Sequence, residues 1–402
     1  MLANLTIKNF RVLQDFRIDK LGHVNLIVGK NNCGKSSVLE ALRIYALRGN
    51  PGILTQIAAS HDESAAFALH GDDAHEGVAC APFSDFFYGR DFPANDADGA
   101  IHIGNQAGTQ FIDISHSYFL DEDEILEPSP DRKLLKKTRR QVPKNALANE
   151  TTFPEQALTV SLHETSHVGW IPFRTNPDPI KRSNDLDFWA RLSKEIPLGY
   201  VPTQLASMDA LASLWDKLAA TSAEASMNAA MQIIDPTFQA LRFVKPVANR
   251  DRVGSAFDLN NSSIAPRERR TAVVQLSSAE KRLPLRSMGE GMQRVLQLIL
   301  EMVSAKGGML LIDEFENGLH WSVQEKIWEM IFQLAHELDI QVFATTHSDD
   351  AIRAFAKVAN ADTQLDAILL RLVRKANPDR TIGISYDKEM LATATLTETE
   401  VR

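Results

Sequence analysis

The sequence has few cysteines, no apolar run of membrane-spanning length and no excess of positive charge. Cys33 and Cys80 are the only cysteines among 402 residues, which excludes a disulfide framework and fits a reducing compartment. The N-terminus shows no signal-peptide pattern, and no segment is apolar for long enough to cross a bilayer. The net charge of −9 excludes an overall basic, nucleic-acid-binding character. We therefore expect a cytoplasmic protein without membrane contact, in which any contact with nucleic acid comes from a local patch.

The sequence also lacks a sustained heptad pattern, which excludes a long coiled coil. Its fractions of hydrophobic residues (44%) and charged residues (24%) are ordinary for a globular protein. The length allows a sizeable core, divided among two or three domains or lobes.

A glycine-rich loop lies between a predicted strand and a predicted helix. Residues 29–36, GKNNCGKS, fit the pattern G-x-x-x-x-G-K-[ST]. The mostly apolar residues 24–28 predict a buried strand before the loop, and apolar residues at helical spacing over 37–47 predict a helix after it. A chance glycine turn is the alternative, but this strand–loop–helix context favours a phosphate-binding site.

The loop residues have distinct expected roles at such a site. Gly29 and Gly34 allow the backbone N–H groups to face the phosphates, and the helix N-terminus adds partial positive charge. Lys35 can reach the β- and γ-phosphates of a nucleotide, and Ser36 can place its hydroxyl on Mg²⁺. The other loop residues that we expect to surround the nucleotide are Asn31, Asn32, Cys33 and Ser37.

Two acidic residues follow a second predicted strand. Residues 309–312 are apolar and are followed by Asp313 and Glu314, so both carboxylates should lie at the carboxyl end of a buried strand. Asp313 is placed to hold Mg²⁺, directly or through water, and Glu314 to polarise an attacking water. A helix N-cap pair is the alternative interpretation, which the presence of a phosphate loop makes less favourable.

A second glycine-containing helix start precedes these acids. Ser287, Gly289 and Glu290 lie in the run SMGEG, directly before a predicted helix over 292–303. Such a helix N-terminus can bind a phosphate group. An ordinary serine-capped helix is the alternative.

Two further residues are candidates for nucleotide contact. His347 follows a predicted strand over 341–345, where it either senses the γ-phosphate or is an ordinary loop histidine. Arg11 lies between two strands of a predicted hairpin, residues 2–8 and 16–19. It either contacts a nucleotide or is a surface arginine at a strand end.

The middle of the chain has a different composition. Residues 49–108 are rich in Ala, Asp, Gly and His and predict irregular loops, and their His and Asp residues do not have the spacing of a metal site. Strands predicted over 101–103, 110–115 and 157–163 make this part a β-rich insertion. Later helices are predicted over 185–196 and 208–234, a polar loop over 249–270, and strands over 240–247, 271–276, 368–372 and 381–386.

The densest basic cluster of the chain lies inside this β-rich insertion. It could bind a phosphate backbone or an acidic protein. A solvated helix end or a flexible loop is the interpretation that we favour, because most charge runs are of that kind. The basic members of the cluster are Arg132, Lys133, Lys136, Lys137, Arg139 and Arg140.

Together these motifs resemble the ABC-type ATPases of the structural-maintenance (SMC), RecF and OLD group. The resemblance covers about residues 1–45 and 283–355 and is closest to stand-alone, OLD-like bacterial ATPases without a nuclease domain. It implies an α/β fold, a P-loop NTPase with the architecture of an ABC-ATPase head. The pieces occur in the expected order: Asn9-Phe10-Arg11, the Walker A loop 29–36, the signature-like 287–291, the Walker B pair Asp313-Glu314 and the switch Thr346-His347-Ser348.

The resemblance also implies how the chain is divided. Residues 1–48 would form the N-terminal lobe of the ATPase core, with Walker A, and residues 241–402 the C-terminal lobe, with the signature, Walker B and the histidine switch. Between them would lie a loop-rich and β-rich insertion, residues 49–175, and a helical subdomain, residues 176–240.

In this group, ATP on the Walker A loop of one subunit is capped by the signature of another. The resemblance therefore implies a homodimer or higher oligomer, in which Ser287 and Gly289 act on a neighbour's γ-phosphate. It implies that Glu314 orients the attacking water and that ATP and Mg²⁺ are the cofactors. The implied ligands of Mg²⁺ are Ser36, Asp313 and, as the glutamine of the metal shell, Gln204.

The absence of a long coiled coil, and of a nuclease domain after the switch, implies an ATPase that controls a separate effector protein. Relatives of this kind act with a nuclease or toxin in two-component anti-phage defence, as in the PARIS and Septu types. The alternative is a RecF-like, ATP-gated DNA-binding repair clamp, which would use the basic cluster; the acidic net charge favours effector control. A scaffold that binds ATP for assembly and scarcely hydrolyses it is a third hypothesis.

Overall fold

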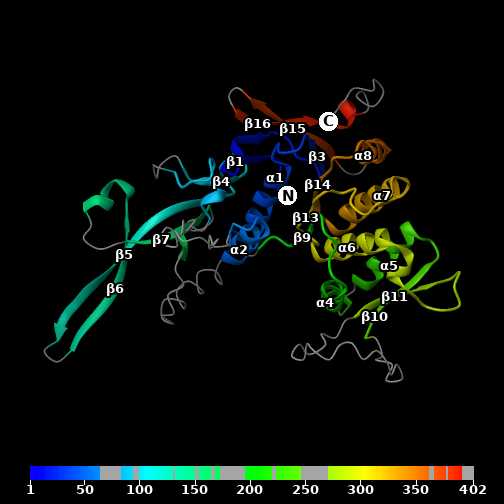
Figure 1. Ribbon diagram of the computed structural model, residues 1–402, viewed down its shortest axis with the longest axis horizontal. Coiled ribbons are helices and arrows are strands. Elements are labelled where there is room, and N and C mark those ends of the chain that lie inside the picture. The colour runs from blue at the N-terminus through cyan, green and yellow to red at the C-terminus, as the bar shows by residue number, and fades with distance from the viewer. Residues whose placement is uncertain are drawn as a thin grey trace, which may run out of the picture.

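Figure 1 shows the computed structural model of the chain. It describes residues 1–63, 83–93, 99–129, 132–149, 154–163, 168–172, 195–219, 223–245, 270–361, 366–376 and 379–391. These residues form a six-stranded sheet, a seven-stranded sheet and a three-stranded sheet, with helices packed around the six-stranded one. The fold is α/β, as predicted from the sequence.

The six-stranded sheet lies in the middle of the molecule (Figure 1). The Walker A, Walker B and switch motifs directly follow three of its strands. All its pairings are parallel except that between the last two strands of the chain. Because the carboxyl ends of parallel strands lie at one edge, the loops that follow them meet there. In spatial order the strands are β16 (Asp379–Tyr386), β15 (Ala367–Ala376), β3 (Val24–Gly29), β14 (Gln341–Thr345), β13 (Met309–Ile312) and β9 (Leu198–Val201).

Side chains of these central strands alternate between two hydrophobic cores, as the pleat of a strand requires. In β3, Leu26 and Val28 pack in one core and Ile27 in the other. This arrangement explains why the strands read as continuous apolar runs: both faces of the sheet are covered. One core includes α1 (Lys35–Ala46) and α2 (Pro51–Ser60), and the other α4 (Met208–Ala219), α5 (Ala223–Ile234), α6 (Glu290–Ser304), α7 (Trp321–Leu338) and α8 (Asp349–Ala361).

The seven-stranded sheet covers the α1 side. The predicted N-terminal hairpin is confirmed, because β1 (Leu5–Phe10) pairs antiparallel with β2 (Leu13–Ile18). On its other edge β1 pairs with β4 (Ile101–Gly104), so strands from residues 1–48 and from residues 49–175 share one sheet. The remaining strands are β5 (Phe111–Ser129), β6 (Arg132–Val142), β7 (Glu155–Leu162) and β8 (Val168–Pro172).

The prediction of irregular loops over residues 49–108 is wrong at α2. Pro51 occupies the first turn, and the Asn50 side chain accepts a hydrogen bond from the backbone N–H of Ile53 at 2.9 Å, a common helix start. Ile53 and Ile57 are fully buried on the same face of this helix. Tertiary burial therefore stabilises a helix that composition alone did not indicate. Residues 64–82 and 94–98 of this stretch lie outside the described part.

The basic cluster forms most of strand β6, not a helix end or a loop. β6 pairs antiparallel with the distal half of β5, and the two strands project from the body as a long hairpin (Figure 1). The register sets acidic residues of β5 opposite basic residues of β6. The cluster is therefore extended, as part of a two-stranded ribbon. The facing pairs are Asp121 with Arg139, Asp123 with Lys137, and Glu124 with Lys136.

The remaining predictions concern the α4–α8 side. The helical pattern over 208–234 corresponds to two helices, α4 and α5, and the pattern over 185–196 falls largely outside the described residues, as does the loop over 249–270. The predicted strands 240–247 and 271–276 are confirmed as β10 (Phe238–Val244) and β11 (Thr271–Leu276), which pair antiparallel. Short elements complete the list: β12 (Leu283–Pro284) and 3₁₀ turns over Ser84–Phe86, Lys144–Asn149 and Leu285–Met288. Among the described residues, no helix is long and apolar enough to cross a membrane.

The start of the chain is fixed at the amino end of the parallel strands. The Gln341 side chain, at the first residue of β14, accepts a hydrogen bond from Leu2 N at 2.9 Å and donates one to Leu2 O at 2.8 Å. Gln341 and Leu2 are both buried. The N-terminus therefore lies at the edge of the sheet opposite the Walker motifs.

Glu301 joins α6 to the edge strand β9 through a hydrogen bond that its carboxylate accepts from Tyr200 N at 3.2 Å. Burial raises its pKa from 4.5 to about 7, against the lowering effect of that hydrogen bond. Between pH 4.5 and about 7, Glu301 is therefore protonated in the folded protein and ionised in the unfolded chain. Stability should fall as pH rises through this window and then remain constant.

We expect Glu301→Gln to remove this fall, because glutamine does not titrate and retains an acceptor for Tyr200 N. The variant should be more stable than wild type at pH 8, by up to about 3 kcal/mol. Urea unfolding at pH 5 and pH 8 measures both effects. Glu329→Gln, at an exposed position of α7, is the control, and an equal response of the two variants to pH would contradict the assignment.

Candidate nucleotide site

The glycine-rich loop leaves β3 at Gly29 and enters α1 at Lys35, so the predicted helix 37–47 is confirmed with slightly earlier bounds. Gly34 caps the helix with a φ of 98° and Gly29 has a φ of 150°, both in the region that favours glycine. A Cβ on Gly29 would lie 2.6 Å from Leu372 O and 2.8 Å from Cys33 Sγ. The loop therefore needs glycine at this position for both conformation and space.

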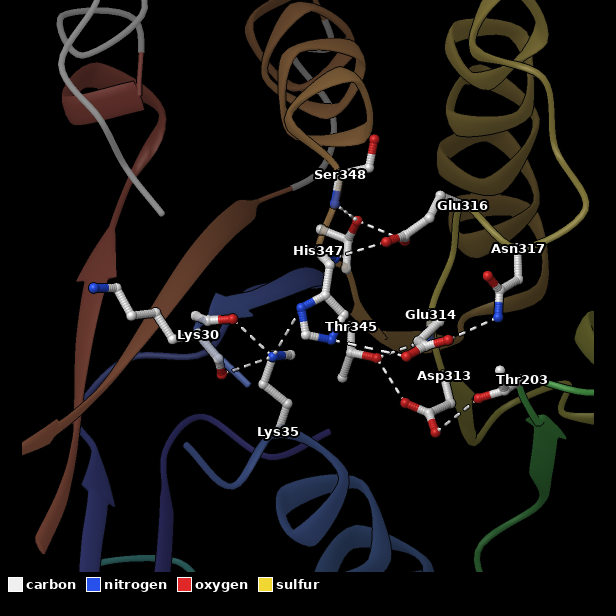
Figure 2. A network of polar contacts seen from close by, with 12 residues as sticks. Lys30, Lys35, Thr203, Asp313, Glu314, Glu316, Asn317, Thr345, His347 and Ser348 are labelled. Carbon is white, nitrogen blue, oxygen red and sulfur yellow. Dashed lines mark hydrogen bonds and ion pairs between the residues drawn. The ribbon is translucent and has the colours of Figure 1, made fainter. Parts of the chain in front are cut away.

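Lys35 is buried under this loop. Its Nζ donates hydrogen bonds to Gly29 O at 2.7 Å and Lys30 O at 3.1 Å, and it lies 3.4 Å from His347 Nδ1 (Figure 2). Burial lowers the pKa of Lys35, and the nearby Cys33, Asp313 and Glu314 act in the opposite direction. The ammonium group is thus held at the carboxyl edge of the sheet, between the phosphate loop and the switch motif.

Asp313 lies directly after β13, where its two carboxylate oxygens are oriented by neighbouring strands. Oδ1 accepts a hydrogen bond from Thr345 Oγ1 at 2.8 Å, and Oδ2 accepts one from Thr203 Oγ1 at 3.3 Å (Figure 2). Thr345 ends β14 and Thr203 follows β9, the two strands that flank β13. The carboxylate of Asp313 and the hydroxyl of Ser36 are oxygen donors of the kind that Mg²⁺ prefers.

Glu314 has a left-handed backbone, with a φ of 46°, a conformation that is uncommon for residues other than glycine. Its backbone N–H is held by Thr345 Oγ1 at 2.9 Å, and its Oε2 accepts a hydrogen bond from Asn317 Nδ2 at 2.7 Å. Its Oε1 lies 3.8 Å from His347 Nε2 (Figure 2). Strain of this kind often marks a functional residue, and here it directs the carboxylate toward the switch histidine.

His347 bridges the two motifs. A lysine ammonium has no acceptor, so the His347 Nδ1 that faces Lys35 accepts and the proton of a neutral ring lies on Nε2, toward Glu314. Glu316 fixes the histidine by accepting hydrogen bonds from Thr346 Oγ1 at 2.6 Å and from the His347 backbone N–H at 2.7 Å. Sequence reasoning missed Glu316, although it lies two residues after the Walker B pair.

A buried arginine supports the same edge from α6. Arg294 is fully buried, and its guanidinium donates to Pro202 O at 2.5 Å and to Asp313 O at 3.1 Å. It therefore ties the segment after β9 to the segment after β13. Gln204, the proposed metal-shell glutamine, lies on the first of these segments and is exposed; its neighbour Thr203 is the residue that contacts Asp313.

Ser287, Gly289 and Glu290 lie at the start of α6, about one turn before Arg294. Gly289, with a φ of 93°, is the N-cap residue, and Ser287 Oγ donates a hydrogen bond to Pro284 O at 2.7 Å. Ser287, Gly289 and Glu290 are exposed. They are not among the described residues that line the cavity around Lys35.

That cavity has a volume of about 930 Å³ and extends from the phosphate loop to the segment after α2. Arg11 lies in its wall. Its Nε is 2.6 Å from Glu40 Oε2, and its Nη1 is 2.5 Å from Glu63 Oε1. The arginine that we expected to contact a nucleotide is thus held between two carboxylates, Glu40 and Glu63, neither of which the sequence indicated. The predicted loop residues that line the same cavity are Asn31, Asn32, Gly34, Lys35, Ser36 and Ser37. Cys33 lines a neighbouring cavity. Burial raises the pKa of its thiol.

The chain is similar to several known proteins. A Helicobacter pylori protein named "ATP/GTP phosphatase" is 22% identical over 369 residues, which are 89% of this chain and 88% of that protein. The "DNA double-strand break repair Rad50 ATPase" of Archaeoglobus fulgidus is 37% identical over 79 residues, only 18% of this chain and 9% of that protein. Among solved structures, the "SmcHead bound to the C-winged helix domain of ScpA" aligns with 96% of this chain and 98% of its own, at 12% identity and a TM-score of 0.47.

The family match covers most of the chain. Residues 24–353, from β3 into α8, match the family described as "AAA domain, putative AbiEii toxin, Type IV TA system". The matched range includes the Walker A loop, the signature-like segment, the Walker B pair and the switch histidine. The chain belongs to this AAA-domain family, and its core has the P-loop fold of an ABC-ATPase head, as predicted from the sequence.

Proposed function

We propose that the chain binds ATP with Mg²⁺ at the carboxyl edge of the six-stranded sheet and hydrolyses it. One observation carries the proposal: three separate segments bring four candidate residues together. Lys35 lies within 3.4 Å of His347, and His347 lies within 3.8 Å of Glu314. Thr345 Oγ1 contacts both Asp313 and Glu314. The phosphate loop, an orienting carboxylate and a metal-binding carboxylate are the parts that phosphoryl transfer to water requires.

Each residue has a defined task in this proposal. Lys35 leaves its carbonyl partners for the β- and γ-phosphates, and Glu314 holds the attacking water, with His347 and Asn317 fixing the carboxylate. Ser36 and Asp313, with Gln204 as a further candidate, would hold Mg²⁺, which when bound neutralises charge on the phosphates. Burial and the carbonyl contacts hold the Lys35 ammonium beside the loop before the nucleotide arrives.

We further propose that two or more copies share composite sites. Ser287 and Gly289 are exposed and are not among the described residues that line the cavity of their own chain, which suits a role at the γ-phosphate on a neighbouring subunit. ATP would then favour the assembled state, because it binds that state more tightly than the separate subunits. The resemblance to stand-alone OLD-like ATPases supports control of a separate nuclease or toxin, as in PARIS- or Septu-type anti-phage defence, from a cytoplasmic location.

A RecF-like DNA clamp is the second candidate. The short, 37% identical match to a Rad50 ATPase supports it, and residues 132–140 are its candidate DNA contact. The β5–β6 register weighs against it, because acidic residues face Lys136, Lys137 and Arg139 across the hairpin. Locally balanced charge releases few counterions from DNA and so gives weak binding.

Light scattering of purified Glu314→Gln protein, with and without ATP–Mg²⁺, tests the proposal. We expect the mass to rise with ATP, because the variant binds the nucleotide but does not hydrolyse it. Lys35→Ala in the same background is the matched control and should stay at the lower mass. A mass that is the same with and without ATP would overturn the composite-site proposal, and steeply salt-dependent DNA binding that is lost in the Lys136, Lys137, Arg139 and Arg140→Glu variant would favour the clamp.

A further inference from the structure

Strand β15 continues past the point where its neighbour β3 ends. The two strands are parallel, and their last register pair joins Leu372 to Gly29, the final residue of β3. β15 itself runs on to Ala376. On the side of β3, residues 373–376 therefore have no strand beside them and extend past the start of the phosphate loop.

The hairpin partner β16 holds this extension against the loop. In the β15–β16 register Arg374 faces Thr381. Thr381 is buried, and its Oγ1 donates a hydrogen bond to the carbonyl of Cys33, inside the phosphate loop, at 3.1 Å. The backbone position of Arg374 is thus fixed relative to the loop by the residue directly opposite.

Arg374 lines both cavities that border the phosphate loop. One is the cavity of about 930 Å³ around Lys35 and Ser36, and the other, of about 390 Å³, is lined by Lys30 and the loop asparagines. A side chain at the junction of the two cavities is within reach of a ligand that rests on the loop.

The charge in the larger cavity favours a cation beside the phosphate loop. Glu40, Glu63 and Glu314 line its wall, and the guanidinium of Arg11 already lies between the first two. ATP adds further negative charge, which a second cation next to Lys35 would help to balance. A guanidinium suits phosphate oxygens because it donates two parallel hydrogen bonds.

We propose that Arg374, carried by the C-terminal β15–β16 hairpin, is a phosphate-binding residue of the nucleotide site. This inference rests on the proposed function. In the bound state its guanidinium donates hydrogen bonds to the phosphate chain of the nucleotide held on the same chain's Walker A loop. The C-terminal hairpin would then complete the phosphate site as well as support the loop.

The test compares Arg374→Ala with Lys375→Ala in the full-length protein. Lys375 is an exposed basic residue, the next one along β15 and on the opposite face of the strand. With Mg²⁺ present, the affinities for ATP and for inorganic triphosphate are measured by calorimetry. Loss of a charge-assisted hydrogen bond predicts about tenfold to hundredfold weaker binding of both ligands to Arg374→Ala, near-wild-type binding to Lys375→Ala, and an unchanged melting temperature.

The outcomes separate this inference from the proposed function. Wild-type affinity in Arg374→Ala, while Lys35→Ala loses ATP, would overturn the inference and leave the function intact. A loss confined to ATP, with triphosphate unaffected, would place Arg374 at the sugar or base and also overturn it. If wild-type protein binds neither ligand, the proposed function fails. Arg374→Gln, which keeps a long polar side chain, replaces the alanine variant if the latter unfolds.

Discussion

Replacing Lys35 with alanine is expected to weaken ATP binding by at least about a hundredfold, because the variant loses the buried cation held at the phosphate loop. The Lys35 Nζ lies between the loop carbonyls of Gly29 and Lys30 and the ring of His347. Its removal leaves that position without positive charge. Equilibrium binding of a fluorescent ATP analogue, in the presence of Mg²⁺, measures the effect.

Lys30→Ala is the matched control for this experiment. Lys30 has the same side chain in the same loop, but Figure 2 shows that side chain directed away from the polar network, with only the carbonyl facing Lys35. Its substitution should change ATP affinity far less. Equal nucleotide affinity in wild type and Lys35→Ala would disprove the assignment of the site.

Glu314→Gln is expected to reduce ATP hydrolysis by about a hundredfold to ten-thousandfold, which is the range for loss of a general base. Glutamine retains the shape and the hydrogen bond from Asn317 but does not accept a proton from water. ATP affinity should therefore stay close to that of wild type. Phosphate release under single-turnover conditions, with binding measured in parallel, separates the two quantities.

Asn317→Ala provides a graded comparison. It leaves the carboxylate of Glu314 in place and removes the hydrogen bond that orients Oε2. Hydrolysis should fall, but less than in Glu314→Gln. Unchanged hydrolysis in Glu314→Gln would favour the scaffold hypothesis, in which ATP serves assembly and another group, or none, activates water.

The predictable part of the site is the part encoded in short segments. The Walker A loop, the apolar run of β13 and the strand before His347 each carry their signal within a few neighbouring residues, so their elements were predicted close to their observed bounds. The parallel order of these strands follows from the fold, and it brings Asp313 and His347 near the loop.

The supporting residues could not be predicted because their partners are distant in sequence. Thr203 contacts Asp313 from a segment 110 positions earlier, and Thr381 contacts Cys33 from 348 positions later. Nothing next to Arg294 in the sequence marks it as the buried support of the Walker B turn. The carboxylates around Arg11 were missed for the same reason, since Glu63 is 52 residues away.

Because Gln341 holds Leu2 at the amino end of β14, residue 1 is a suitable point for attaching the protein to a surface or a reporter. Met1 is 65% exposed, whereas Leu2 is buried at the amino end of β14. The strand rises about 3.3 Å per residue, so a tag on the first residue is separated from the nucleotide edge by the full length of the sheet. Protein immobilised through its N-terminus will therefore present the Walker motifs, the switch histidine and the C-terminal hairpin to solution.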